Sequence, residues 1–153
     1  MAKVQRHPRL LNNTHPMVYE VNARILIAEL SARAGSPVTL ATIPDTMIDE
    51  WAELGFDAVW LMGLWSTGSI GTDQARSIPA LQEEYRRCLP DLTPDDIASS
   101  QFAVQAYVVA PALGGNKALR TLRKRLAERG LGLLLDFVCN HTARDHEWVF
   151  EHP

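Results

Sequence analysis

The sequence predicts an α/β fold built on parallel strands, and three features of the chain support this class. Strand patterns and helix patterns alternate along the chain. Two apolar runs, at residues 57–61 and 131–138, lack the polar alternation of a half-exposed strand, as expected for strands buried on both faces of a parallel sheet. A long excursion and a helix separate these runs, and such a crossover returns the chain to the same sheet in a parallel, right-handed sense.

The first strand and the first two helices are predicted between residues 17 and 55. Residues 17–21 alternate apolar and polar side chains and are rich in β-forming residues. Residues 23–34 follow as a helix. After Asp45, apolar side chains recur at helical spacing through residue 54, and Gly55 ends the pattern. This amphipathic helix leads directly into the apolar strand at 57–61.

The excursion between the two apolar runs contains a loop and further helices. Residues 66–77 are rich in glycine and small polar side chains, which predicts a flexible loop. Residues 79–89 carry apolar side chains at helical spacing, and Thr93 precedes a proline and two acidic residues, as at the start of a short helix. The clearest helix begins at Asn116, its predicted N-cap, and ends at Gly130. Its apolar seam consists of Leu119, Leu122 and Leu126.

Composition excludes several classes of protein. The chain is 46% hydrophobic and 22% charged, which is typical of a soluble globular domain. Its 15 Lys and Arg residues against 18 Asp and Glu residues give a net charge of −3, so we expect no nucleic-acid partner and no membrane partner. The N-terminal segment lacks the apolar core of a secretory signal. Two distant cysteines without zinc spacing fit a reducing compartment, and we therefore expect a cytoplasmic protein.

The order of strands and helices is that of the opening part of a barrel. A complete (β/α)8 TIM barrel needs about 250 residues, whereas the sequence has 153. We therefore expect an incomplete, partial (β/α)8 barrel that comprises about strands 1 to 3 with their helices. In this interpretation residues 1–16 are an N-terminal extension, and residues 17–153 are the N-terminal portion of the barrel domain.

Polar residues gather directly after the last predicted strand. They are Asp136, Asn140, His141, Asp145 and His146. A carboxylate beside the apolar residues 133–135 needs hydrogen-bond or charge partners if it is buried. In parallel α/β folds, ligands and catalytic groups gather at the carboxyl ends of the strands. The same residues also fit a plain capped strand end, in which Asp136 accepts hydrogen bonds from backbone amides and His141 lies on the surface.

Residues 136–142, Asp-Phe-Val-Cys-Asn-His-Thr, resemble the Asp-x-Val-x-Asn-His motif that ends the third barrel strand in the α-amylase family, glycoside hydrolase family 13. Residues 55–61 resemble the second-strand segment of this family, and residues 102–115 resemble the segment before its second helix. Residues 127–131 resemble the entry to strand three, and residues 145–148 the continuation in glucosidase-like members. The resemblance implies a glycosidase or transglycosylase that acts on the α-glucosidic bonds of an α-glucan or α-glucoside.

The resemblance also implies roles for single residues. It makes His141 a hydrogen-bond donor to the sugar at the cleaved bond and Asp136 a support for neighbouring active-site groups. It makes Asn140 a loop organiser and, in many members, a calcium ligand, so calcium is the candidate cofactor. Further substrate-binding candidates are the aromatic residues Phe102, Tyr107 and Trp65. Together these assignments predict that Asp136, Asn140 and His141 line the rim of one sugar cleft.

The chain departs from the family pattern in ways that affect the chemistry. Many members have Tyr at the position of Phe102 and acidic residues at the positions of Ala106 and Ala110. Glycoside hydrolysis requires two carboxyl groups across the scissile bond, and in this family both come from later strands. We therefore assign no catalytic residue, and we expect the chain to be inactive without the remainder of the barrel, which would be its partner.

Other functions also fit these residues. Ala106 and Ala110 fit a non-catalytic carbohydrate-binding chain or one partner of a split barrel. A second alternative is a small metal-dependent hydrolase with a divalent metal bound by four side chains. These are Asp136, His141, Asp145 and His146. The basic helix at 117–129 fits either a phosphate-binding face or the solvated outer helix of a barrel.

Overall fold

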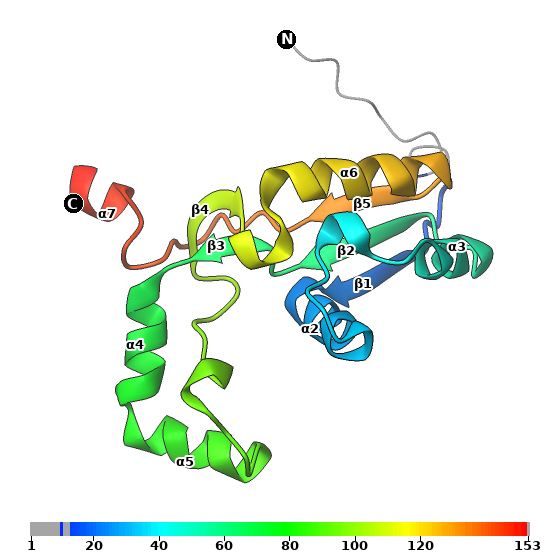
Figure 1. Ribbon diagram of the computed structural model, residues 1–153. Helices are drawn as coiled ribbons and strands as arrows, with labels where there is room; N and C mark the ends of the chain where they lie inside the picture. Colours follow the sequence, from blue (N-terminus) through cyan, green and yellow to red (C-terminus); the bar gives the residue numbers. More distant parts are fainter. Residues whose placement is uncertain (1–9, 11–12, 153) are drawn as a thin grey trace. The chain divides into compact units, whose positions relative to one another are not determined.

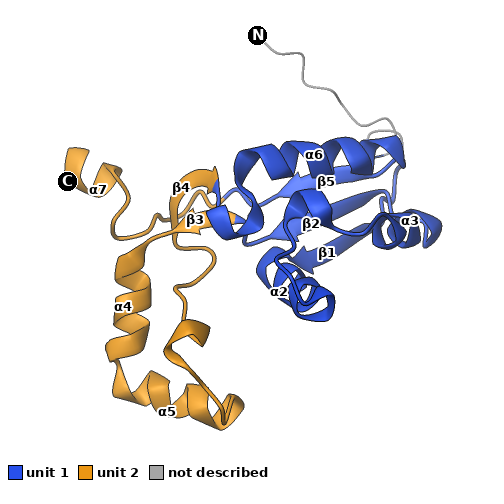
Figure 2. Cartoon of the chain, viewed as in Figure 1, with its two compact units in different colours: residues 1–64, 109–137 blue, residues 65–108, 138–153 orange. Residues whose placement is uncertain are grey.

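The computed structural model describes residue 10 and residues 13–152 (Figure 1). Most of the N-terminal extension that the sequence predicts at residues 1–16 therefore lies outside the described residues. The chain divides into two compact units (Figure 2). Unit 1 comprises Met1–Leu64 and Val109–Phe137, and unit 2 comprises Trp65–Val108 and Val138–Pro153. Among the described residues, no helix has both the length and the apolar composition that crossing a bilayer requires.

Unit 1 is a parallel sheet with its connecting helices (Figure 1). Its elements in chain order are β1 (Val18–Asn22), α2 (Ala23–Ala34), η1 (Leu40–Thr42), α3 (Asp45–Glu53), β2 (Ala58–Met62), η3 (Pro111–Leu113), α6 (Gly115–Glu128) and β5 (Gly132–Leu135). The three strands lie in the order β1-β2-β5, and both neighbouring pairs are parallel. The predicted α/β class with parallel crossovers is confirmed.

The central strand β2 carries the core of the sheet. Ala58, Val59 and Leu61 have no exposed surface. By contrast, residues 133–135 of β5 are only half-buried. Within the described residues β5 has a neighbouring strand on one side only. The prediction that both apolar runs are buried on both faces is therefore correct for most of β2 and wrong for β5.

Helices α3 and α6 present the apolar faces that the sequence predicts, except that Leu119 of the predicted α6 seam is only half-buried. Ile48 and Trp51 of α3 are buried, and α6 packs against β5 and η1. The buried residues of α6 are Ala118, Leu122 and Leu126. Burying a Leu side chain contributes about 1.5–3 kcal/mol relative to leaving it exposed. These two faces therefore hold the helices on the sheet.

The start of α6 differs from the prediction. Gly114, with φ of +92°, occupies the N-cap position. The Asn116 side chain does not cap the helix but accepts a hydrogen bond from the Val109 backbone N–H at 2.9 Å. A Cβ atom at Gly114 would lie 2.7 Å from the Ala118 Cβ and 2.9 Å from the Thr39 Cβ. The close packing and the left-handed backbone at residue 114 therefore set the helix start, and the assignment of Asn116 as N-cap is wrong.

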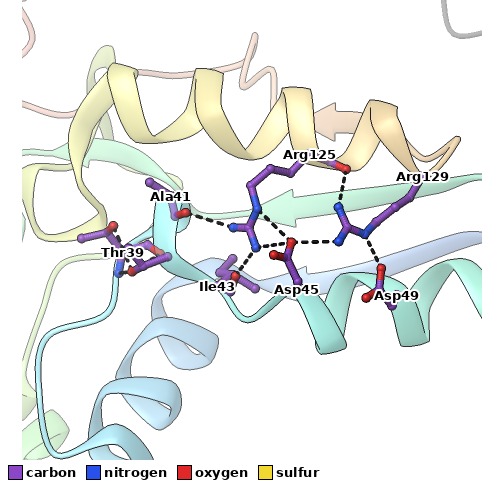
Figure 3. A network of polar contacts seen from close by, with 8 residues as sticks. Thr39, Ala41, Ile43, Asp45, Asp49, Arg125 and Arg129 are labelled. Atoms are coloured by element: carbon purple, nitrogen blue, oxygen red, sulfur yellow. Dashed lines mark hydrogen bonds and ion pairs between the residues drawn. The ribbon is translucent and has the colours of Figure 1, made fainter.

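Arg125 of α6 joins this helix to the segment around η1 and α3 (Figure 3). Its guanidinium donates to the carbonyl oxygens of Ala41 at 2.9 Å and Ile43 at 2.5 Å, and to Asp45 Oδ1 at 2.8 Å. The Arg125 side chain is only 17% exposed. The hydrogen bond from Arg125 holds the pKa of the Asp45 carboxyl below its usual range. This planar group therefore satisfies two backbone acceptors and one carboxylate at once.

Arg129 extends the same network by one helical turn (Figure 3). It donates to Asp45 Oδ1 at 2.8 Å and forms an ion pair with Asp49. The hydrogen bond with Asp49 raises the pKa of the Arg129 guanidinium. Two of the basic residues on the predicted basic helix therefore bind acidic residues of α3, which favours the interpretation of α6 as an outer helix of the fold.

Unit 2 contains a two-stranded sheet and short helices. Its elements are β3 (Trp65–Thr67), α4 (Ser69–Ser77), α5 (Pro79–Cys88), η2 (Pro94–Asp96), β4 (Val104–Val109), whose last residue belongs to unit 1, and α7 (Trp148–Glu151). The helix predicted at 79–89 and the helical turn after Thr93 are confirmed as α5 and η2. The flexible loop predicted at 66–77 is wrong, because this segment forms most of β3 and all of α4.

A contact from far along the chain explains why α4 forms. Asp145 Oδ2 accepts a hydrogen bond from the Ser69 N–H at 2.8 Å and one from the Ile70 N–H at 3.5 Å. The N-cap residue Gly68 has no side chain to do this, and a Cβ there would lie 1.7 Å from Asp145 Oδ1. The glycine that suggested a loop therefore leaves room for a distant carboxylate that caps the helix.

Candidate functional site

Asp136 is a buried carboxylate at the carboxyl end of β5, with an exposed fraction of 8%. Oδ1 accepts a hydrogen bond from the Trp60 indole Nε1–H at 2.8 Å, and Oδ2 accepts one from the Gly63 N–H at 2.6 Å. Trp60 lies in β2 and Gly63 directly follows it, and β2 neighbours β5 with Leu61 opposite Leu135. The partners that a buried acid requires are therefore present, and one of them, Trp60, belongs to the apolar run at 57–61 that the sequence predicts to be buried.

Arg24 extends this group to the first strand. It lies in the first turn of α2, which begins where β1 ends, and its Nε–H donates to the Gly63 carbonyl oxygen at 2.9 Å. Burial lowers the pKa of the Arg24 guanidinium. Gly63 has φ of +75°, a backbone conformation that residues other than glycine rarely adopt. The carboxyl ends of all three strands of unit 1 thus meet in one polar group, which we name the strand-end cluster: Arg24, Trp60, Gly63 and Asp136.

Sequence reasoning found Asp136 but missed Arg24 and Gly63. A signal for both residues exists in the sequence, because Gly63 lies two residues after the predicted strand at 57–61 and Arg24 lies three residues after the predicted strand at 17–21. In a parallel sheet those positions gather at a single edge. The strand-end rule that selected Asp136 therefore applies equally to the first two strands.

Two aromatic candidates lie together in unit 2. Trp65 of β3 and Tyr107 of β4 have ring centroids 5.2 Å apart in an edge-to-face arrangement. The Tyr107 hydroxyl donates to the Val138 carbonyl oxygen at 3.0 Å and accepts from the Val138 N–H at 2.8 Å. Phe102, the third aromatic candidate, is half-buried in the segment before β4. Unit 2 therefore brings Trp65 and Tyr107 into contact and ties Tyr107 to the segment that follows β5.

The predicted motif is divided between the two units. Asp136 belongs to unit 1, whereas Asn140 and His141 belong to unit 2. Both of the latter residues are exposed, and Asn140 Oδ1 accepts a weak hydrogen bond from the Cys139 Sγ–H at 3.6 Å. The exposed imidazole of His141 is accessible to a ligand. That the three residues line one cleft stays a prediction.

The residues of the metal-dependent alternative have other contacts. Asp145 caps α4, and the buried His146 accepts a hydrogen bond on Nδ1 from the Trp148 N–H at 3.1 Å. In the part of the chain that the structure describes, no three His, Cys, Asp or Glu side chains are grouped so that they could hold a metal ion. The geometry therefore gives no support to a metal-dependent hydrolase at these residues.

Calcium is the cofactor that the family resemblance implies at Asn140. Calcium takes about six to eight oxygen ligands, and Asn140 offers one amide oxygen that already contacts Cys139. Among the described residues, no three His, Cys, Asp or Glu side chains form a group that could hold a metal ion at Asn140. These residues do not make a calcium site by themselves, and Asn140 as a calcium ligand stays a prediction.

A pocket of about 250 Å³ lies elsewhere in unit 2. Its walls are formed by Tyr85, Leu89, Leu92, Asp96, Ile97 and Ala98. None of the site residues that the sequence predicts lines this pocket. The pocket is therefore a feature of the helical excursion and not of the motif.

A parallel sheet with crossover helices, and with polar groups gathered where its strands end, is the arrangement of a (β/α) barrel, of which this chain forms a part. Residues 47–153 match the family model described as the alpha amylase catalytic domain. The chain therefore belongs to the α-amylase family, and the resemblance seen in the sequence is confirmed.

Solved structures of this family share the fold. An α-amylase from Lactobacillus plantarum matches with a TM-score of 0.57 and 22% identity, over 90% of this chain and 26% of that one. A trehalose-6-phosphate hydrolase from Bacillus licheniformis matches with a TM-score of 0.55 and 16% identity, over 89% of this chain and 19% of that one. An alpha-glucosyl transfer enzyme matches with a TM-score of 0.54 and 19% identity, over 89% and 20% of the two chains. The chain thus spans about a quarter or less of the length of these proteins.

Proposed function

We propose that this chain supplies the first part of the substrate-binding cleft of an α-amylase-family glycoside hydrolase or transglycosylase that acts on α-glucosidic bonds. The observation that carries the proposal is the Asp136-to-His141 motif at the end of β5, inside the span that matches the α-amylase catalytic domain. Three of the matching structures are named as an α-amylase, a trehalose-6-phosphate hydrolase and an alpha-glucosyl transfer enzyme. The substrate class in this proposal is an α-glucan or α-glucoside.

Within this proposal, single residues take the roles that the motif implies. His141, an exposed imidazole, hydrogen-bonds a sugar hydroxyl, and Phe102 and Trp65 offer ring faces for stacking. Asp136 supports the site by holding the ends of β2 and β5 together through Trp60 and Gly63. A carboxylate with both oxygens already engaged in this way is suited to fixing geometry.

The proposal assigns no catalytic acid, base or nucleophile to this chain. Retaining and inverting glycosidases both need two carboxyl groups that flank the scissile bond. Asp136 is bound to Trp60 and Gly63, and Asp145 is bound to the N-terminus of α4. We therefore propose that hydrolysis or transfer requires carboxylates from outside this sequence, with residues 17–153 forming one portion of the catalytic domain and residues 1–16 an extension.

The exposed free thiols of Cys88 and Cys139 support a cytoplasmic location in this proposal. Reduced, unpaired cysteines persist where glutathione and thioredoxin keep thiols reduced. Growth of a tagged chain in its host, followed by fractionation, tests the location. Recovery from the extracellular fraction would contradict it.

Binding of a disaccharide tests the proposed function directly. We expect maltose to quench or shift the tryptophan fluorescence of the chain, and cellobiose, which has the same sugars in a β-linkage, to have a much smaller effect. His141→Ala should abolish the maltose response, whereas His152→Ala, at another exposed histidine, should leave it unchanged. A flat maltose titration, or equal responses to the two sugars, would contradict the proposal.

Enzyme assays separate an enzyme portion from a non-catalytic sugar-binding chain. We expect the 153-residue chain to release no product from an α-linked oligosaccharide by itself. When the gene is extended past codon 153, the longer product should gain activity if it contains an Asp and a Glu in barrel-strand contexts. A natural stop codon at that point, together with maltose binding, would favour the carbohydrate-binding alternative.

A further inference from the structure

The Tyr107 hydroxyl makes two hydrogen bonds to the same residue. It donates to the Val138 carbonyl oxygen at 3.0 Å and accepts from the Val138 N–H at 2.8 Å. A phenol has one proton to donate, and here Val138 takes it. A role as a direct hydrogen-bond donor to a sugar would therefore require Tyr107 to release the backbone of Val138.

Two further contacts hold the segment that begins at Val138. The Ala143 N–H donates to the Val104 carbonyl oxygen of β4 at 2.9 Å. Asp145 binds the N–H of Ser69 at 2.8 Å at the start of α4. We name residues 138–145 the motif loop, which is thus fixed near its beginning, near its middle and at its end.

Asn140 and His141 lie between the first two of these contacts. Both side chains are exposed, while Ala143 is buried. The backbone on either side of the exposed pair is therefore held by β4, through the Tyr107 side chain at residue 138 and through the Val104 carbonyl at residue 143. Ordering a loop before the ligand arrives reduces the conformational entropy lost on binding.

Trp65 gives the Tyr107 ring a fixed orientation. The two rings meet edge to face with centroids 5.2 Å apart and an interplanar angle of 72°. Tyr107 is 43% exposed, so packing alone does not bury it. The ring contact and the two hydrogen bonds together direct the hydroxyl toward the motif loop.

We propose that Tyr107 is a positioning residue that orders the motif loop, so that Asn140 and His141 are presented to the sugar in one conformation. This inference rests on the proposed function for the role of His141. It changes the assignment of Tyr107 from a substrate-binding candidate to a residue that acts through the backbone of Val138. Trp65 supports it as the neighbour that orients the ring.

The substitution Tyr107→Phe tests this proposal, because it removes the hydroxyl and keeps the ring that contacts Trp65. We expect amide hydrogen exchange at Val138 to become roughly tenfold faster, and maltose binding to weaken about three- to tenfold, as befits the loss of one or two neutral hydrogen bonds. The imidazole NMR signal of His141 should broaden or shift in the absence of ligand. The matched control is Tyr85→Phe, a tyrosine of α5 in the same unit, which should alter none of these quantities.

The readouts distinguish this inference from the proposed function. If the unmodified chain binds maltose and Tyr107→Phe binds it equally well, with unchanged exchange at Val138, the positioning role is refuted while the proposed function stands. If the unmodified chain binds no maltose, the proposed function is refuted. In that case faster exchange at Val138 and an altered His141 signal in Tyr107→Phe still support positioning, and unchanged values refute it.

Discussion

Replacing Asp136 tests how much the hydrogen bonds of the strand-end cluster stabilise the fold. In Asp136→Ala the N–H of the buried Gly63 and the indole N–H of the half-buried Trp60 both lose their acceptor. Leaving a buried donor unsatisfied costs about 1–3 kcal/mol. With one donor buried and the other half-buried, we expect the free energy of unfolding to fall by about 2–4 kcal/mol.

Asp136→Asn is a finer version of the same test. Its amide keeps one acceptor oxygen but places an NH2 group against the second donor, so we expect a loss of about 1–2 kcal/mol. Urea denaturation followed by tryptophan fluorescence measures both variants, since Trp60 itself reports on the cluster. Glu53→Gln, at an exposed position of α3, is the matched control. Unfolding curves of both Asp136 variants within about 0.5 kcal/mol of the unmodified chain, the range of a surface substitution, would refute the reasoning.

Three other perturbations follow from single contacts. Arg125→Ala should lower the free energy of unfolding by about 2 kcal/mol, because two carbonyl acceptors lose their hydrogen-bond donor. Arg123→Ala, at an exposed position of the same helix, should change the free energy of unfolding little. Equal urea midpoints for the two variants would contradict this prediction. Gly68→Ala should displace Asp145 from the N-terminus of α4 and lower the free energy of unfolding by about 1–2 kcal/mol through the lost helix cap. Unchanged helical circular dichroism together with unchanged stability would contradict this prediction. The hydrogen bond from Arg125 lowers the pKa of Asp45 from 3.8. The ionised Asp45 therefore stabilises the fold above pH 3.8, and this contribution is lost as the pH falls through the lowered pKa. In Asp45→Asn the free energy of unfolding should therefore depend less on pH below about pH 4.

Local sequence patterns were sufficient to predict the main helices and strands of unit 1. The alternation at residues 17–21, the helical spacing ended by Gly55 and the apolar run at 57–61 each specify one element without help from distant residues. Parallel pairing then follows from the crossover helices. What the patterns lacked was the place of each strand in the sheet, and for that reason the edge strand β5 was expected to be as buried as β2.

Unit 2 depended on contacts that no local pattern contains. The glycine and small polar residues at 66–77 are typical of a loop. In the structure they include helix α4, whose N-terminus is capped by Asp145, 76 residues after Ser69. The strand β4 carries buried residues at its two ends and exposed ones at Tyr107 and Val108, so it has no regular alternation. In the same way the partners of Asp136 come from β2 and the residue that directly follows it, more than 70 residues earlier in the chain.

The candidate site was predictable in its residue types and not in its connections. The rule that ligand-binding groups lie where parallel strands end identified Asp136 and the motif loop. It could not reveal that the Asn116 amide binds Val109 or that the Tyr107 hydroxyl binds Val138, because both depend on how the chain turns between elements. Family resemblance supplied the expected sugar, and the structure supplied the contacts that hold the loop.

The most direct measurement is histidine-selective NMR of the chain during a maltose titration. We expect the imidazole signal of His141 to shift with saturation while those of His15 and His152, which are also exposed, stay in place. Such a result would show that the residue five positions after Asp136 contacts an α-linked glucoside. Maltose that moves no histidine signal, or moves those of His15 and His152 as much as that of His141, would contradict the proposal that the motif loop binds sugar.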